Sequence, residues 1–156
     1  MIRATLIAAT LATTATADTF GRWVVEPAAA DNGTVYCWLT STNFQGSDFG
    51  MFWNEHGAMG SVLVGGPRRI NARSTVSIWV DDSDFQWSRA ERLDMEDVIA
   101  FDALTPDLAA QFVIGRTMSI DVDGDLRGDF DFDLTGSSAA FSAFLDCAAM
   151  IVGEGA

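Results

Sequence analysis

Hydrophobic and polar residues alternate most regularly toward the C-terminal end of the chain. From residue 129 to residue 134, three aspartates alternate with Phe130, Phe132 and Leu134. Successive side chains of a β-strand point to opposite faces, so this pattern predicts a strand with one apolar and one acidic face. Thr135 and Gly136 end the alternation and indicate a tight turn.

An amphipathic helix is predicted directly after this turn. Ser137 or Ser138 is placed to cap its first turn through the side-chain hydroxyl. Apolar residues then recur at spacings of three and four, namely Ala140, Phe141, Phe144, Leu145, Cys147, Ala148 and Ile151. Because Cys147 belongs to this stripe, we expect it to face a core strand.

The rest of the chain is typical of short strands with one further helix. Strands are expected at 20–26, 34–39, 49–53, 59–64, 75–80, 85–87, 98–101 and 117–122, with loops at 27–33 and 41–48. Residues 34–39 are apolar on both faces, which favours a central strand. Thr105 and Pro106 predict the start of a helix that ends at Gly115. The predicted fold is α+β and mainly β, with β-sandwich-like antiparallel sheets of about eight short strands and two helices.

The first 17 residues have the pattern of a signal peptide. Arg3 precedes an uncharged run of apolar and small residues, and Ala15-Thr16-Ala17 resembles a cleavage site, so we expect cleavage between Ala17 and Asp18. The alternative is a membrane anchor, but the run is shorter and less apolar than the roughly 20 residues that a spanning helix needs. The chain is therefore predicted to be a signal peptide at 1–17 and one β-rich secreted domain at 18–156, with no membrane span after cleavage.

The chain is strongly acidic and contains no lysine. Loss of Arg3 leaves eight arginines against 22 acidic residues, a net charge of −14. Such a charge repels nucleic acid and anionic lipid, which excludes both as partners. Five tryptophans and eleven phenylalanines indicate a packed core rather than disorder.

The chain has two cysteines, Cys37 and Cys147. In an exported protein this number favours one disulfide, which would tether the C-terminal helix to the early strand at 34–39. Two separate free thiols are the alternative.

A dense group of aspartates suggests a calcium site as one interpretation. Asp121, Asp123, Asp125 and Asp129 are the candidate ligands, since hard cations prefer several oxygen ligands. An EF-hand loop that begins at Asp121 would have Leu126 in place of its glycine and Phe132 in place of its last glutamate, so that motif does not match. The other interpretation is a polar turn beside an edge strand whose charges block edge-to-edge pairing. We expect no cofactor, with Ca²⁺ as the alternative.

Enzymatic motifs are absent from the sequence. His56 is the only histidine and lies in a predicted hairpin turn beside Glu55, without a nucleophile motif to accompany it. One histidine and two cysteines that are expected to be bonded also cannot build a closed zinc site. The chain is therefore predicted not to be an enzyme.

Two further groups of residues are candidates for a binding surface. An aromatic platform for sugars or a peptide could use Phe44, Phe49, Phe52, Trp53, Trp79 and Trp87, although packing between two sheets explains the same residues. Arg68, Arg69 and Arg73 lie in one connection and could meet an acidic partner. Solvation or pairing with nearby acids is the alternative for these arginines.

The run from Phe132 to Cys147, together with the leader, Trp23 and Cys37, resembles small exported alphaproteobacterial proteins of the invasion-associated locus B family. The resemblance implies a secreted, β-rich fold that ends in a strand–glycine–helix unit. The chain lacks that family's further cysteines, and its aspartates at 129, 131 and 133 are unusual for it. The family supplies no catalytic residues to carry over.

These observations together predict a periplasmic or secreted, non-enzymatic binding module of a Gram-negative bacterium. Its expected partner is an envelope protein or a small ligand. The alternatives are a calcium-binding envelope module and a small cell-envelope hydrolase or enzyme inhibitor.

Overall fold

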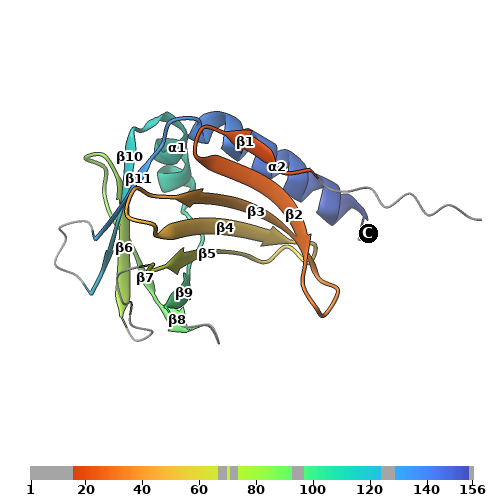
Figure 1. The fold of residues 1–156 in the computed structure, drawn as a ribbon, viewed down its shortest axis with the longest axis horizontal. Coiled ribbons are helices and arrows are strands. Elements are labelled where there is room, and N and C mark those ends of the chain that lie inside the picture. The colour runs from red at the N-terminus through yellow and green to blue at the C-terminus, as the bar shows by residue number, and fades with distance from the viewer. Residues whose placement is uncertain (1–15, 67–69, 71–73, 93–96, 124–128, 155–156) are drawn as a thin grey trace, which may run out of the picture.

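The computed structural model describes residues 16–154 except 67–69, 71–73, 93–96 and 124–128. Within these residues the chain forms eleven strands and two helices, arranged as two antiparallel sheets (Figure 1). This arrangement confirms the predicted mainly β, α+β fold class.

The larger sheet has seven strands and carries most of the fold. In their order across the sheet these are β1 (Asp18–Phe20), β2 (Trp23–Ala29), β3 (Val35–Thr42), β4 (Asp48–Asn54), β5 (Met59–Val64), β9 (Val98–Phe101) and β8 (Glu91–Arg92). The strand that holds Cys37 is β3, which pairs with β2 on one side and β4 on the other. It is therefore an interior strand, as its two apolar faces predict.

The smaller sheet has four strands and stands against one end of the larger one (Figure 1). In order these are β11 (Phe130–Asp133), β10 (Thr117–Val122), β6 (Thr75–Val80) and β7 (Gln86–Arg89). Helix α1 (Pro106–Ile114) contacts β6, and helix α2 (Ser137–Glu154) lies across β1 to β4 and contacts α1. The core fills the space between the sheets and helices.

Trp23 is the central aromatic residue of this core. Its side chain is fully buried, and its ring packs edge-on against Phe49 and Phe112 at centroid distances of 6.2 and 4.9 Å. The indole Nε1–H donates to the Asp133 carbonyl oxygen at 3.0 Å, so the buried donor has a partner. Trp23 thereby ties β2 to the end of β11.

The first strand of the sequence-based prediction is divided in the structure. The expected strand at 20–26 is a tight hairpin, because Gly21 adopts a positive φ of 65° and separates β1 from β2. The expected loop at 27–33 is partly wrong, since β2 continues to Ala29. Pro27 is tolerated there because β1 pairs only as far as Val25, so the strand edge beside Pro27 needs no N–H donor.

The helix boundaries were predicted well, but one cap was not. Thr105 caps α1 by accepting a hydrogen bond from the Leu108 N–H at 3.3 Å, and Gly115 follows the last helical residue. Ser137 instead begins α2, and its hydroxyl donates to the Phe112 carbonyl oxygen at 2.8 Å. That hydrogen bond joins the start of α2 to α1.

The edge strand β11 confirms the acidic alternation. Phe130 and Phe132 are buried, whereas Asp131 and Asp133 are exposed. Asp133 also shapes the turn into α2, because its Oδ1 accepts the Thr135 N–H at 2.8 Å.

This hydrogen bond makes the stability of the turn depend on pH. The Thr135 backbone N–H is the largest cause that holds the pKa of Asp133 below its ordinary value; the Thr135 hydroxyl and Arg22 act in the same direction, against a small opposing effect of burial. A lowered pKa in the folded state adds stability above the unfolded pKa of about 3.9, and this stability is lost as the pH falls through the folded pKa.

We expect Asp133→Asn to weaken the protein at pH 7 and to make little difference at pH 2. Urea unfolding at both pH values tests this, together with a carboxyl ¹³C titration. A measured pKa of Asp133 at or above the unfolded value would contradict it.

Candidate binding groove

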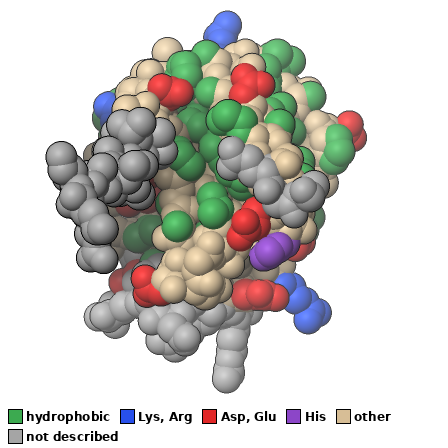
Figure 2. Space-filling view, turned by 90° about the vertical axis from the view of Figure 1, so that its right-hand side faces the viewer, with side chains coloured by type: hydrophobic (Ala, Val, Ile, Leu, Met, Phe, Trp, Pro, Cys, Tyr) green, Lys and Arg blue, Asp and Glu red, His purple; other side chains and the backbone are tan. Residues whose placement is uncertain are grey.

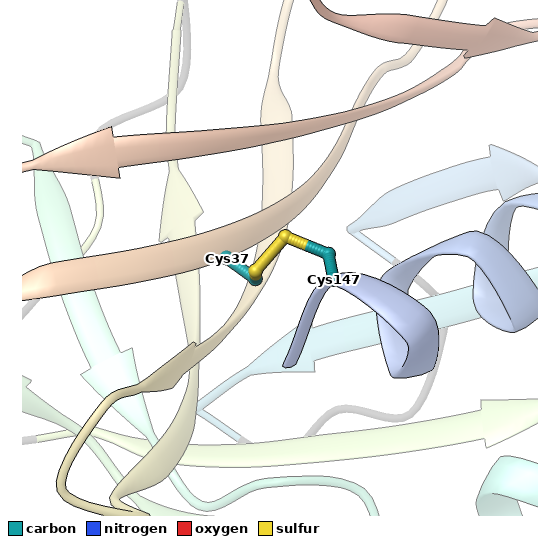
Figure 3. Close-up of a disulfide and its surroundings, with 2 residues drawn as sticks. All are labelled: Cys37 and Cys147. Carbon is teal, nitrogen blue, oxygen red and sulfur yellow. A yellow bond between two sulfur atoms is a disulfide. The ribbon is translucent and has the colours of Figure 1, made fainter. Parts of the chain in front are cut away.

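A disulfide joins Cys37 on β3 to Cys147 on α2, with their Cα atoms 5.9 Å apart (Figure 3). Cys37 is fully buried, and Cys147 is almost so. The bridge closes a sequence separation of 110 residues and holds the middle of α2 against the interior strand β3. The predicted pairing and the tethered C-terminal helix are both confirmed.

An open groove of about 890 Å³ lies beside this bridge. Its walls are the second half of α2 and the neighbouring ends of β2 and β3. The residues that line it are Asp18, Val25, Pro27, Ala28, Ala29, Val35, Ala143, Asp146, Cys147, Met150 and Ile151, together with Thr16, which the expected cleavage after Ala17 removes. This volume falls in the range of small-molecule and peptide sites. Figure 2 views the end of the molecule where α2 finishes and shows hydrophobic side chains gathered on this face, with acidic side chains around them.

Small side chains create the groove. Pro27 and Ala29 lie on the same face of β2 as buried Val25, but they are too short to fill the space in front of α2. Ala143 has the same effect on the helix, one turn before Cys147. Met150 stands at the rim with 64% of its surface exposed. Asp18 and Asp146 are the charged residues of the lining, so the rim is acidic.

The edge of the larger sheet is open along the groove. Pairing between β1 and β2 ends where Asp18 faces Val25, and in the described part of the chain no strand continues beyond this point. The stretch 26–29 of β2 therefore presents an outer edge that no described strand pairs with, and Pro27 contributes no N–H donor to it. An extended chain laid in the groove could pair with this edge while its apolar side chains enter the space below α2.

The aspartates proposed for calcium lie in different environments. Asp121 is fully buried on β10, Asp123 is exposed with a positive φ of 83°, and the Asp129 Oδ2 accepts the Val122 N–H at 3.3 Å. Asp125 lies outside the described residues. Across the described ranges, no three His, Cys, Asp or Glu side chains form a group that could hold a metal ion. Calcium binding here stays a prediction.

His56 lies in the turn between β4 and β5, as predicted. Its side chain is 71% exposed, and its Nε2 is 3.8 Å from the Glu55 Oε1. The turn is shaped by Asn54, whose Oδ1 accepts the backbone N–H groups of His56 and Ala58. The arrangement is that of an ordinary hairpin turn, and the neighbouring Glu55 hydrogen-bonds to the backbone of Val35, which lines the groove.

The six candidate aromatic residues do not form one platform. Phe49 is core, while Phe52 packs with Tyr36 and Trp38 on the opposite face of the larger sheet. Phe44 is exposed beneath the guanidinium of Arg22. Trp53 is half-buried on the core face beside Cys37, whereas Trp79 and Trp87 lie together on the smaller sheet. Packing thus explains part of the set, and half-buried Trp79 and exposed Trp87 on the smaller sheet remain.

The arginines Arg68, Arg69 and Arg73 lie outside the described residues. No helix in the described ranges is long and apolar enough to cross a membrane.

Sequence reasoning missed the groove because its β2 wall was assigned to a loop. The short apolar run from Pro27 to Ala29 carries no alternation of large and small side chains that would indicate a strand. The signal that could have revealed it is the length of this run. When the hairpin folds back, the run is long enough to pair with the start of β3.

The fold and groove together define a disulfide-linked, mainly β domain in which a C-terminal helix is laid across a sheet. A crystal structure of invasion associated protein B from Bartonella henselae shares this fold, with a TM-score of 0.66. The two chains are 16% identical over an alignment that covers 86% of this chain and 98% of the other. The resemblance predicted from the sequence is thus confirmed at the level of the fold. No protein-family model and no curated protein matches the chain.

Proposed function

We propose that the chain is a non-enzymatic binding module that works outside the cytoplasm and holds an extended apolar segment of an envelope protein in the groove. The observation that carries this proposal is the apolar groove of about 890 Å³ that runs along a strand edge with which no described strand pairs. The edge supplies main-chain hydrogen bonds and the groove supplies apolar contact, which is the combination used in recognition by strand addition.

Two features support an extracytoplasmic location. The leader at 1–17 has the composition of an export signal, and the bonded cysteine pair is compatible with an oxidising compartment.

The acidic rim limits the ligand. Asp18 and Asp146 border the groove, and the whole chain carries a net charge of −13. An anionic ligand such as a fatty acid would be repelled, so the ligand is expected to be neutral or cationic.

The groove can be tested with the neutral apolar dye Nile red. Met150→Asp places a charge at the rim, and we expect it to raise the dissociation constant of the dye about tenfold, because a charge is poorly tolerated in an apolar site. Ile114→Asp is the matched control: Ile114 is 75% exposed and is not part of the groove lining. Fluorescence titration of the protein purified from a periplasmic fraction gives both constants.

Two results would count against the groove. Dye binding that is unchanged in Met150→Asp would place the bound dye elsewhere. If Trp87→Ala abolishes dye binding and Met150→Asp does not affect it, the dye binds on the smaller sheet.

A further inference from the structure

Three aromatic side chains form an exposed cluster on the outer face of the smaller sheet. Phe85 is 44% exposed, Trp87 is 54% exposed and Trp79 is half-buried. Phe85 meets Trp79 at a centroid distance of 5.1 Å and an interplanar angle of 86°, and it meets Trp87 at 6.3 Å and 70°. Because Phe85 lies edge-on to both tryptophans, we call these three residues the aromatic corner. Clustered exposed aromatic rings are uncommon on a monomer and mark interaction sites.

The strand register connects the aromatic corner to a carboxylate. Trp79 on β6 lies opposite Ser119 on β10, and Ser119 lies opposite Asp131 on β11. These side chains share one face, and with neighbouring strands about 4.8 Å apart the backbone positions of Trp79 and Asp131 are separated by roughly 10 Å. The Ser119 hydroxyl donates to the Asp131 Oδ1 at 2.7 Å, which fixes the position of the carboxylate group.

Phe44 shows how this protein covers an exposed ring with its own cation. Phe44 is 76% exposed, and the guanidinium carbon of Arg22 lies 3.8 Å from the centre of its ring. In the part of the chain that the structure describes, no guanidinium covers a ring of the aromatic corner in this way. Arg89, two residues after Trp87 on β7, is the described cation on this face, and it lies at the end of the strand away from Phe85.

We infer that this face binds an arginine-bearing basic segment of a partner protein. A guanidinium stacks flat on an indole ring, and a second guanidinium of the same segment can give its fork of N–H donors to a carboxylate further along the row. Asp131 is exposed and lies in that row. The excess of 22 acidic over nine basic residues attracts a basic partner and repels an anionic one. A quaternary ammonium ligand would gain the ring contact alone, because it has no N–H group to give to Asp131.

The test uses the capped peptide acetyl-Gly-Arg-Gly-Arg-Gly-amide and the same peptide with citrulline in place of arginine. Citrulline keeps the shape of arginine and removes its charge. We expect the arginine peptide to shift the indole N–H resonances of Trp79 and Trp87 and to leave that of buried Trp23 in place, while the citrulline peptide binds at least about tenfold more weakly. The titration is run at about 0.15 M salt, where distant surface charges are screened.

Four variants separate a built site from general acidity. Trp87→Ala is expected to weaken binding of the arginine peptide about fivefold to tenfold, and Asp131→Asn about threefold. Phe44→Ala removes another exposed ring and Asp31→Asn another exposed acid, outside the groove lining, and both are expected to leave the affinity within about twofold of the parent value. Trp87 and Asp131 are exposed, so their variants are expected to fold, and the dispersion of the amide spectrum checks this.

The inference is overturned if Asp131→Asn and Asp31→Asn weaken binding equally and Trp87→Ala does not weaken it. It is also overturned if tetramethylammonium shifts the same two indoles with an affinity equal to that of the arginine peptide. Met150→Asp leaves this binding unchanged if the groove and the aromatic corner are separate sites, so the two proposals fail independently.

Discussion

Replacing both Cys37 and Cys147 with alanine is expected to lower the free energy of unfolding by about 4–5 kcal/mol at 25 °C. The bridge spans 110 residues of sequence, and in the chain-entropy model a cross-link of this span removes about that much entropy from the unfolded chain. A domain of this size has a total stability of roughly 5–15 kcal/mol, so the variant would lose a large part of it. Urea unfolding followed by tryptophan fluorescence measures the change.

The slope of the unfolding curve gives a second readout. Without the cross-link the unfolded chain expands and exposes more surface, so the dependence of the unfolding free energy on urea is expected to become steeper. The parent protein unfolded with a strong reductant present is the matched control, because it loses the same bridge without a substitution. If the reduced parent and the double variant differ from the oxidised protein by less than about 1 kcal/mol, the bridge is not what holds α2 on β3.

The same substitution links the bridge to the groove. Cys147 lines the groove between Ala143 and Met150, and Cys37 lies below it on β3. A helix freed from β3 would change the groove's width even where the protein stays folded. We therefore regard the disulfide as the element that sets the shape of the proposed binding site.

Those parts of the fold that depend on local patterns could be predicted from the sequence. The alternation at 129–134, the stripe that contains Cys147 and the capping threonine before Pro106 each specify one element through neighbouring residues. The disulfide was predictable because two cysteines allow a single intramolecular pairing.

What depends on register could not be predicted. The row that leads from Trp79 through Ser119 to Asp131 joins three segments, and its existence depends on which residues face each other across β6, β10 and β11. The groove depends in the same way on Pro27 and Ala29 standing opposite α2. Sequence alone marked Trp79 and Trp87 as candidates but grouped them with Phe49, which packs in the core.

The close contact of two turns accounts for a glycine requirement at the start of α2. Gly136 has a positive φ of 86°, and a Cβ atom on it would lie 2.5 Å from the carbonyl oxygen of Phe20 and 2.9 Å from its carbon. Gly21, in the turn between β1 and β2, makes the corresponding contact from the other side, since a Cβ there would lie 2.9 Å from the carbonyl oxygen of Thr135. Both obstacles are backbone atoms, so no rotation of a side chain relieves them.

Gly136→Ala is expected to lower the free energy of unfolding by about 3 kcal/mol. The left-handed conformation accounts for about 1–2 kcal/mol of this loss, and the displacement of the neighbouring turn accounts for the rest. Because α2 begins one residue later, we also expect the variant to shift the amide resonances of β1 and the first turn of the helix. Urea unfolding and an amide spectrum measure the two effects.

Two other glycines separate the conformational cost from the contact. Gly57 has a similar φ of 82° with no atom within 4 Å of its Cβ position, so Gly57→Ala carries the conformational cost alone, about 1–2 kcal/mol. Gly153 lies within α2 with open space around it, and Gly153→Ala is expected to stabilise the protein by about 0.5–1 kcal/mol because alanine favours a helix. If Gly136→Ala costs no more than Gly57→Ala, then the turn before α2 does not rest against the turn between β1 and β2. The helix would then be positioned by the disulfide and by its apolar stripe alone.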